Sequence, residues 1–312
     1  MRDYEAIAAK FWNLPSKGEE ESRRETLFMD DIIQKAHLDR EIEALLPGVQ
    51  TVLDAGGGAG RFSIPLAKRG LKVTHLDVSA SMLAKAKETA EAEGVLENLT
   101  FVQARLTDIA RYPDAHFDLV LSFDAPVSYV YPKQDDVLRE LVRVSRKAVV
   151  VSVVSRLGAS HYWFNPTYKR QYIIDPDSTD PLMKWYPALT PELLDKWYPD
   201  FEDYRRFRET GLLEDPQSVQ AEMERGKTPW PVTYCFRPQE LKTVLEEAGL
   251  QGVRLAGPGA LARSIPQPVL KKLLFTPSLR QGFLDACYEY DSDPHVCGMG
   301  TDTLVASGVK PA

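Results

Sequence analysis

Residues 50–155 alternate short apolar runs with helical patterns, and this alternation limits the possible folds more than any other feature of the chain. Helical patterns at 61–69, 79–93 and 133–145 separate apolar runs at 50–55, 72–77, 98–103, 117–123 and 148–154. Nearly continuous apolar strands occur in sheets that are covered on both faces. The pattern therefore predicts an α/β fold with a parallel, doubly wound sheet.

The regular alternation stops after residue 155 and returns near the C-terminus. Residues 156–234 are rich in aromatic side chains and predict a mainly helical cap. A helix at 237–248, a strand at 251–255 and a closing strand at 302–309 complete the core pattern within 235–312. Residues 256–300 form an insertion with expected helices near 268–275 and 278–290, and residues 1–49 are expected to form a helical N-terminal segment or lid.

A glycine cluster, Asp-Ala-Gly-Gly-Gly-Ala-Gly at 54–60, joins the first strand to the first helix. Glycines permit a sharp turn and close approach of a ligand to the backbone, and the following helix N-terminus suits an anionic group. Asp77 ends the second strand, where an acid can accept hydrogen bonds from two ribose hydroxyls. The segment thus predicts a nucleotide site.

The glycine spacing separates two classes of cofactor. A dinucleotide fingerprint counted from Gly56 needs its third glycine at position 61, which is arginine. The observed spacing, an acid at 54 followed by glycines at 56, 58 and 60, resembles the nucleotide loop of class I S-adenosylmethionine-dependent methyltransferases. Residues 75–79, His-Leu-Asp-Val-Ser, resemble the second motif of that family.

The resemblance implies a Rossmann-like sheet of seven strands, mostly parallel with the last strand antiparallel. It also implies S-adenosyl-L-methionine as cofactor and S-adenosyl-L-homocysteine as product. Asp54 would orient the loop, Asp77 would hold the ribose, and Phe123 would flank the methionine. The implied cofactor-binding residues are Asp54, Ala55, Gly56, Gly58, Gly60, Asp77, Val78, Met82, Leu106 and Phe123.

The segment after the third strand departs from the family pattern. The family often places an Asp there, on the adenine amino group, but this chain has Arg105, whose guanidinium only donates hydrogen bonds. Adenine contact is expected instead from the Leu106 backbone or from Asp108.

Catalytic candidates follow the fourth and fifth strands. Asp124 and Tyr129 lie in the segment at 122–129, where the methyl group should meet the acceptor, and Tyr131 comes soon after. His161 opens the aromatic segment. Each could accept a proton from the acceptor, whereas a turn-forming Asp and a structural His are the simpler alternatives.

Two further groups of residues are candidates for the walls of the site. The aromatic segment, which includes Trp185 and Tyr186, either caps an apolar or cationic substrate or forms the core of a helical subdomain. Tyr4, Phe11 and Trp12 lie on an amphipathic N-terminal segment that in the family often folds over the cofactor. Arg40 and Arg61 are either cationic partners for the methionine carboxylate or solvated surface residues.

Composition narrows the classes of partner. The 312 residues carry a net charge of −7, which opposes an electrostatic grip on nucleic acid. No apolar run has the length of a membrane span and no signal peptide is evident, so a cytoplasmic location is expected. Three cysteines fit a reducing compartment, and the spacing of Cys287, His295 and Cys297 matches no zinc pattern, so no metal is expected.

The leading hypothesis is a methyltransferase that moves a methyl group to an O, N or C atom of a small-molecule acceptor by in-line displacement. An NAD(P)-dependent oxidoreductase and a methyltransferase-like binding protein without turnover are the alternatives. A nucleic-acid or protein acceptor is a further alternative at the level of substrate. The sequence leaves the oligomeric state open.

Overall fold

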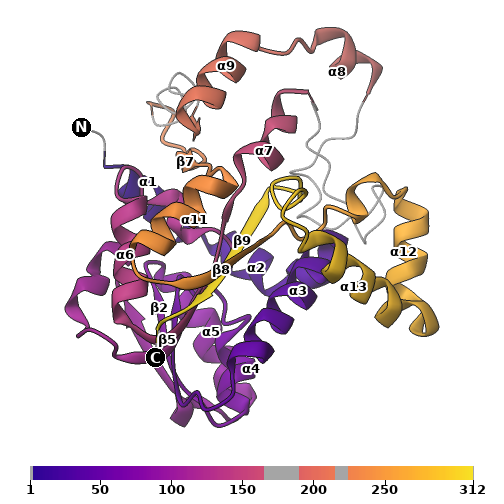
Figure 1. Cartoon of the computed structure of the whole chain (residues 1–312). Coiled ribbons are helices and arrows are strands. Elements are labelled where there is room, and N and C mark those ends of the chain that lie inside the picture. The colour runs from indigo at the N-terminus through magenta and orange to yellow at the C-terminus, as the bar shows by residue number, and fades with distance from the viewer. Residues whose placement is uncertain (1–2, 165–189, 215–223, 312) are drawn as a thin grey trace.

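A seven-stranded sheet forms the centre of the computed structural model, which describes residues 3–164, 190–214 and 224–311 (Figure 1). The strand order is β3-β2-β1-β4-β5-β9-β8; β9 runs antiparallel to both of its neighbours, β5 and β8, and the other neighbouring pairs of this sheet are parallel. This arrangement confirms the predicted doubly wound, Rossmann-like sheet. The strands are β1 (Thr51–Ala55), β2 (Lys72–Asp77), β3 (Leu99–Gln103), β4 (Phe117–Ser122), β5 (Ser145–Val154), β8 (Gln251–Ala256) and β9 (Thr303–Val309).

Helices cover both faces of the sheet. The α-helices that contribute to the core or its extensions are α1 (Tyr4–Trp12), α2 (Pro15–Leu27), α3 (Met29–Leu45), α4 (Ser63–Lys68), α5 (Ala80–Ala92), α6 (Gln134–Val144), α11 (Pro238–Glu247), α12 (Gln267–Phe275) and α13 (Pro277–Asp291). Short 3-10 helices are η1 (Leu96–Asn98), η2 (Leu106–Arg111), η3 (Pro126–Tyr129), η4 (Ser160–Phe164) and η6 (Ala262–Ser264).

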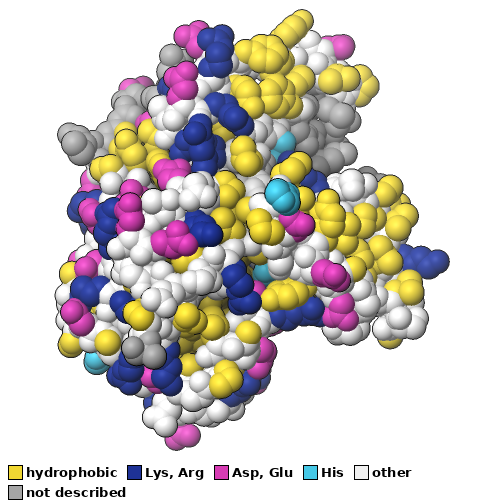
Figure 2. Space-filling view, in the orientation of Figure 1, with side chains coloured by type: hydrophobic (Ala, Val, Ile, Leu, Met, Phe, Trp, Pro, Cys, Tyr) yellow, Lys and Arg dark blue, Asp and Glu magenta, His cyan; other side chains and the backbone are white. Residues whose placement is uncertain are grey.

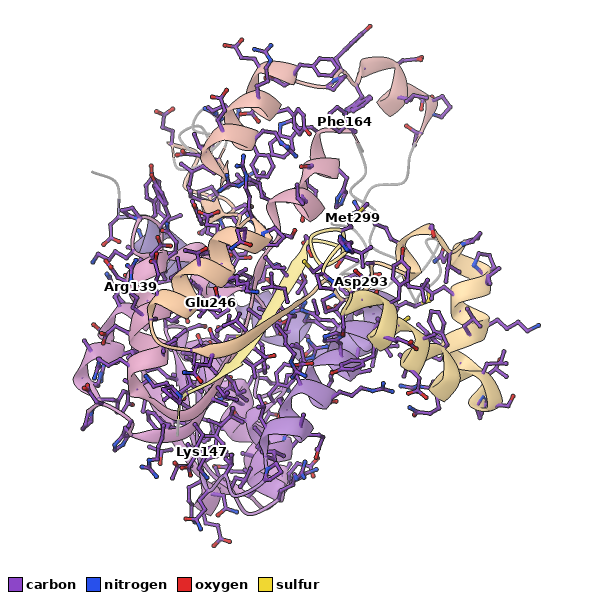
Figure 3. The ribbon with its side chains drawn as sticks, in the orientation of Figure 1. Arg139, Lys147, Phe164, Glu246, Asp293 and Met299 are labelled. Atoms are coloured by element: carbon purple, nitrogen blue, oxygen red, sulfur yellow. The ribbon has the colours of Figure 1, made fainter. Side chains whose placement is uncertain are left out.

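The apolar runs are continuous because each strand buries side chains on both faces. In β5, Val149 and Val151 pack in the core formed with α6 and α11, whereas Val150 points into the core formed with α3 and α4. Figure 3 shows Arg139 of α6 and Glu246 of α11 on the outer side of the first of these layers. Two separate apolar cores thus hold the strand ends in place on either side of the sheet.

Helix α5 begins where the sequence predicts. The Ser79 hydroxyl accepts a hydrogen bond from the Met82 N–H at 3.2 Å, which satisfies one free donor of the first turn. The same hydroxyl lies 3.0 Å from the Trp12 carbonyl, to which it donates. Ser79 therefore joins the second βα unit to the N-terminal helices.

The cap follows β5. Its described elements are α7 (Arg156–Ala159), η4, α8 (Pro191–Lys196), α9 (Phe201–Thr210) and the two short strands β6 (Leu212–Leu213) and β7 (Thr233–Tyr234). Trp163 stacks on the buried Phe207 with ring centroids 4.3 Å apart. Exposed apolar side chains, including Tyr198 and Phe201, gather over α8 and α9 at the top of Figure 2.

The predicted aromatic segment is described only in part. Trp185 and Tyr186 lie outside the described residues. In the described part, Trp163 and Phe207 belong to a fourth apolar core that also includes Val154 of β5.

Helices α12 and α13 form an extension beside α3. Leu270, Leu274 and Phe283 pack against Met29 and Ile33 in a third core that is separate from the sheet. The expected helices near 268–275 and 278–290 correspond to these two elements. In the part of the chain that is described, no helix combines the length and apolar character that crossing a membrane requires.

Candidate active site

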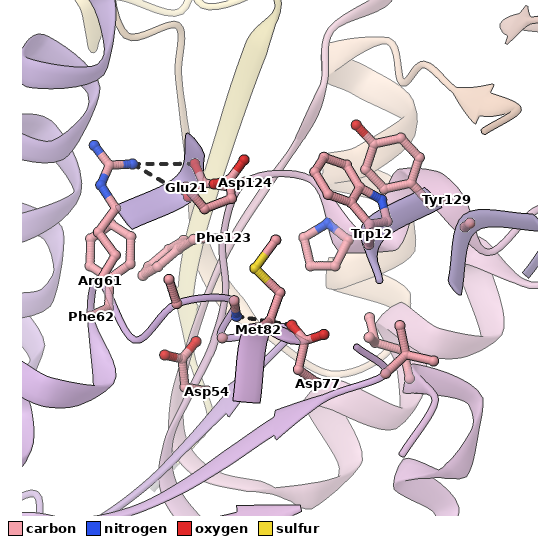
Figure 4. Close-up of a pocket in the computed structure, with 18 of the residues that line it drawn as sticks. Trp12, Glu21, Asp54, Arg61, Phe62, Asp77, Met82, Phe123, Asp124 and Tyr129 are labelled. Atoms are coloured by element: carbon pink, nitrogen blue, oxygen red, sulfur yellow. Dashed lines mark hydrogen bonds and ion pairs between the residues drawn. The ribbon is translucent and has the colours of Figure 1, made fainter. Parts of the chain in front are cut away.

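A cavity of about 900 Å³, counted with its open mouth, lies at the carboxyl ends of β1, β2 and β4 (Figure 4). Ligands of doubly wound sheets bind at this edge because the loops that leave the strands diverge there. The N-terminal helices close the cavity from the other side. The described residues that line it are Glu5, Ala8, Trp12, Glu21, Asp54, Gly56, Gly57, Gly58, Ala59, Arg61, Phe62, Asp77, Val78, Met82, Leu106, Phe123, Asp124, Pro126, Tyr129 and Val130.

The glycine loop forms the floor of the cavity. Gly56 has φ of +82°, and a Cβ atom there would lie 2.5 Å from Pro126, so a side chain would collide with η3. Gly58 has φ of +55°, and its N–H donates to the Asp77 carboxylate at 2.9 Å. The loop and the acid of the second strand are thus one hydrogen-bonded unit.

Asp54 lies beneath this loop and is 1% exposed. Burial raises its pKa to about 7, although the Ser63 hydroxyl donates to its carboxylate. Ser63 also lies 2.7 Å from Nδ1 of His75, whose pKa burial lowers to about 4. The predicted role of Asp54 in orienting the loop agrees with this position, because its carboxylate is held from the helix side and still lines the cavity.

Asp77 is placed to bind a polyol. Its carboxylate also accepts from the Ser79 N–H at 2.8 Å, and burial raises its pKa. Val78, Met82 and Leu106 line the neighbouring part of the cavity and give it an apolar surface. All four residues are predicted from the sequence, and the structure brings them together at the cavity.

Three of the predicted site residues lie outside the lining. Ala55 is fully buried within β1, where its carbonyl accepts from the Ser122 hydroxyl at 2.9 Å. Gly60 has φ of +89°, and a Cβ atom there would lie 2.7 Å from Ile64, so this glycine serves the packing of the loop on α4. For these two residues, contact with the cofactor stays a prediction.

His161 is the third residue outside the lining. It lies in η4, where Nδ1 contacts the Gly158 carbonyl and lies 2.6 Å from the Arg263 guanidinium. Burial, followed by the charge of Arg263, lowers its pKa. The histidine is part of the contact between the cap and the loop after β8 and is absent from the described lining, so its catalytic role stays a prediction.

Asp124 lies at the end of β4 in an unusual backbone conformation, with φ of +63°. Its N–H donates to the Ser152 hydroxyl at 2.9 Å. Its carboxylate meets two guanidinium groups, Arg24 at 3.0 Å and Arg61 at 3.3 Å. Figure 4 shows the contact with Arg61. A carboxylate that neutralises two buried cations is poorly suited to remove a proton, so the structure favours an electrostatic role over general-base catalysis.

Tyr129 also lines the cavity but keeps its proton. Burial raises the pKa of its hydroxyl far above the ordinary value. Its ring meets that of Trp12 edge-to-face, with centroids 5.4 Å apart. Tyr129 is therefore a wall of the cavity whose hydroxyl can donate a hydrogen bond, and its catalytic role stays a prediction. Tyr131 stacks on Tyr234 and is absent from the described lining.

The two arginine candidates have different environments. Arg61 lines the cavity with 10% of its side chain exposed, donates to the Asp31 carbonyl at 2.6 Å and pairs with Glu25 at 2.9 Å. Arg40 pairs with Asp285 far from the cavity, which is the predicted surface alternative. Among residues 3–164, 190–214 and 224–311, no group of three His, Cys, Asp or Glu side chains could hold a metal ion.

The N-terminal helices contribute residues that sequence reasoning missed. Glu5 and Ala8 of α1, together with Glu21 of α2, line the cavity beside Trp12. Burial raises the pKa of the Glu21 carboxyl, which lies 3.1 Å from Arg24. The helical patterns of this segment show which residues can face inward, but they do not indicate which strand end the segment covers.

Comparisons with known proteins agree with this geometry. The family model of a methyltransferase domain matches residues 52–148. The tRNA 5-carboxymethoxyuridine methyltransferase of Escherichia coli (strain K12) is 35% identical over 154 residues, 49% of this chain and 56% of that protein. The chloroplastic magnesium protoporphyrin IX methyltransferase of Arabidopsis thaliana is 37% identical over 107 residues, 34% of this chain and 33% of that protein.

A solved structure shows the same fold. The phosphoethanolamine N-methyltransferase 2 of Haemonchus contortus, in complex with S-adenosyl-L-methionine, matches with a TM-score of 0.51 and 14% identity, over 100% of this chain and 61% of that one. The matched region spans about half the length of the Escherichia coli relative and a third of the Arabidopsis one.

Proposed function

Because residues 52–148 place this chain in the class I S-adenosylmethionine-dependent methyltransferases, we propose that it transfers a methyl group from S-adenosyl-L-methionine to a small-molecule acceptor. One observation carries the proposal: a single cavity joins the glycine loop and Asp77 to the polar cluster at Asp124. The cofactor end and the acceptor end of such a reaction would therefore share one enclosed space.

The cavity fits this cofactor by the chemistry of its walls. Carboxylates at Asp77 and Asp54 suit hydroxyl and amino donors, and the apolar surface of Val78 and Met82 suits a planar base. The cationic Arg61 lies at the opposite end, near Phe123, where a carboxylate group would find a partner. Each part of the cofactor thus has a complementary residue.

When bound, S-adenosyl-L-methionine supplies a methyl group on a positively charged sulfur. The chain then has to orient the acceptor and exclude water, which supplies much of the rate of such a displacement. Trp12 and Tyr129 enclose the space above the loop, and Phe62 and Phe123 pack 4.6 Å apart beside it. For an acceptor that carries a proton, Glu21 is the lining carboxyl with a raised pKa on the acceptor side.

The charge of the cavity walls limits which classes of acceptor molecule the site can bind. Five lining residues are acidic, namely Glu5, Glu21, Asp54, Asp77 and Asp124, whereas Arg61 is the one cation among the described lining residues. Arg24 adds a second cation just behind the wall. An excess of carboxylates attracts a cation and repels an anion. We therefore infer an uncharged or cationic small molecule as the acceptor.

A nucleoside in tRNA is the second candidate acceptor. It is favoured by the 35% identity to the Escherichia coli tRNA 5-carboxymethoxyuridine methyltransferase. It is opposed by the net charge of −7 and by the acidic walls of the cavity.

The cysteines bear on the proposed cellular location. Three buried cysteines without disulfide bonds support the expected reducing, cytoplasmic environment.

The test uses S-adenosyl-L-methionine labelled with tritium on its methyl group. The chain is incubated with the label and a mixture of amine, alcohol and phenol metabolites, and in parallel with total tRNA. The proposal expects label in the small-molecule fraction only. Label that enters only tRNA would replace the small-molecule acceptor by the second candidate. Binding of the cofactor without labelled product in either arm would favour a protein without turnover on these acceptors.

A thermal-shift comparison distinguishes the methyltransferase from the remaining alternative, an NAD(P)-dependent oxidoreductase. S-Adenosyl-L-homocysteine should raise the unfolding temperature, whereas NAD and NADP should leave it unchanged, because ligands stabilise only the proteins that bind them. A shift with NAD or NADP alone would support an oxidoreductase.

A further inference from the structure

The order of the strands indicates which end of the cavity holds the base of the proposed cofactor. The order is β3-β2-β1-β4, so the ends of these strands form a row. The proposed ribose site at Asp77 lies at the end of β2. On one side of it are the loop after β1 and then Asp124 after β4. The other side leads to Leu106 after β3. The adenine therefore belongs beside Leu106.

This end of the cavity is apolar except for one side chain. Val78, Met82, Leu106 and Ala8 line it with hydrocarbon surface. Beyond Asp77, Glu5 is the polar side chain that the described residues contribute there. Glu5 comes from α1 and lies 72 residues before Asp77 in the chain.

Glu5 is held in place from the strand side. Both of its carboxylate oxygens accept from the Thr107 hydroxyl, at 3.1 and 3.2 Å. Arg105 lies 3.6 Å from the same carboxylate, and only 13% of the Glu5 side chain is exposed. Arg105 itself caps η2, with its N–H donating to Asp108 at 3.1 Å. Arg105, which cannot accept a hydrogen bond from adenine, thus holds Glu5, which can.

We propose that Glu5 is the specificity-determining residue for the adenine base, accepting a hydrogen bond from its 6-amino group. The proposal rests on the proposed function, because it assumes an adenosyl cofactor in this cavity. It also assigns a task to α1: the helix that covers the cavity completes the recognition of the base.

The chemistry of a carboxylate makes the proposal selective. An ionised carboxylate only accepts hydrogen bonds, so it favours the amino group of adenine and repels the 6-oxo group of hypoxanthine. The amide of glutamine offers both an oxygen and an NH₂ group, and it can turn either toward the base. Glu5→Gln should therefore bind both bases with similar affinity, and the change keeps the size of the side chain.

The test is calorimetric titration of the full chain with S-adenosyl-L-homocysteine and with S-inosyl-L-homocysteine, in which a 6-oxo group replaces the 6-amino group and N1 carries a hydrogen. The chain with Glu5 should bind the inosyl compound about 10- to 100-fold more weakly, the range expected for a hydrogen bond to a charged group. Glu5→Gln should reduce this ratio to within about threefold. Asp3→Asn is the matched control, because Asp3 also approaches Arg105, at 3.7 Å, but is absent from the described lining.

The outcomes are distinguishable. An unchanged ratio in Glu5→Gln, with the folded state checked by circular dichroism, would overturn the role of Glu5 while leaving the proposed function in place. A ratio that falls equally in Asp3→Asn would also overturn it, since the effect would then come from the charge around Arg105. If the unaltered chain binds neither compound, the proposed function itself fails.

Discussion

At the scale of single residues, the site depends on carboxylates that the backbone holds in place. Asp77 accepts from two N–H groups, those of Gly58 and Ser79, and so couples the loop after β1 to the end of β2. The sequence predicts Asp54 and Asp77 because their positions relative to glycines and strands are local features. It could not place Glu5 or Glu21, since their positions depend on how distant helices pack.

Asp77→Asn should weaken the binding of S-adenosyl-L-homocysteine by about 10- to 100-fold. The NH₂ group of asparagine would either face one of the backbone N–H donors or replace an oxygen that accepts from a ligand hydroxyl. Calorimetric titration measures the change. The control is Asp108→Asn, which alters an exposed carboxylate near the same edge of the sheet. Equal affinities in all three proteins would show that Asp77 does not contact the ligand.

Asp54 should make stability depend on pH. Its pKa in the folded chain is about 7, raised by burial from an ordinary value of 3.8. The folded state therefore holds a proton that the unfolded state loses between about pH 4 and pH 7, so this group stabilises the fold below that window and the contribution is lost as the pH rises through it. Asp54→Asn removes the dependence.

The measurement is the free energy of unfolding by urea for both proteins at pH 5 and pH 8. Relative to the unaltered chain, Asp54→Asn should gain about 3 kcal/mol between the two pH values, because about two pH units of the titration, from pH 5 to pH 7, fall within the measured range. Because all other titrating groups are shared, a difference between the proteins that stays constant with pH would contradict the assigned pKa.

At the scale of elements, α2 and α3 attach to the sheet through buried charges. Arg24 of α2 is 10% exposed and contacts Asp31 at 2.7 Å and Asp124 at 3.0 Å. The guanidinium links the start of α3 to the end of β4, and hence the N-terminal helices to the floor of the cavity. An amphipathic pattern predicts helices here, but the pairing of distant charges is a property of the packed chain.

Arg24→Met should destabilise the fold by about 3–5 kcal/mol, because it leaves buried carboxylates without their cation. Arg69→Met, which removes an exposed pair with Glu43, should cost no more than about 1 kcal/mol. Urea unfolding of both variants provides the comparison. If both variants lose a similarly small free energy of unfolding, water replaces the contacts of Arg24 with Asp31 and Asp124 without cost, which contradicts the prediction.

At the scale of the whole molecule, the regular part of the fold is the part that local sequence predicts. The strand at 251–255 and the closing strand at 302–309 correspond to β8 and β9, and the two helices of the C-terminal insertion correspond to α12 and α13. The contact between the cap and the loop after β8 was not predictable, because His161 and Arg263 are 102 residues apart.

The central claim, that the cavity at the ends of β1, β2 and β4 binds an adenosyl cofactor, is tested most directly by calorimetric titration of the full chain with S-adenosyl-L-homocysteine. We expect saturable binding of one ligand per chain, lost or weakened at least tenfold in Asp77→Asn, and no heat of binding with NAD. The absence of binding to the unaltered chain, or binding with the same affinity in Asp77→Asn, would contradict the account.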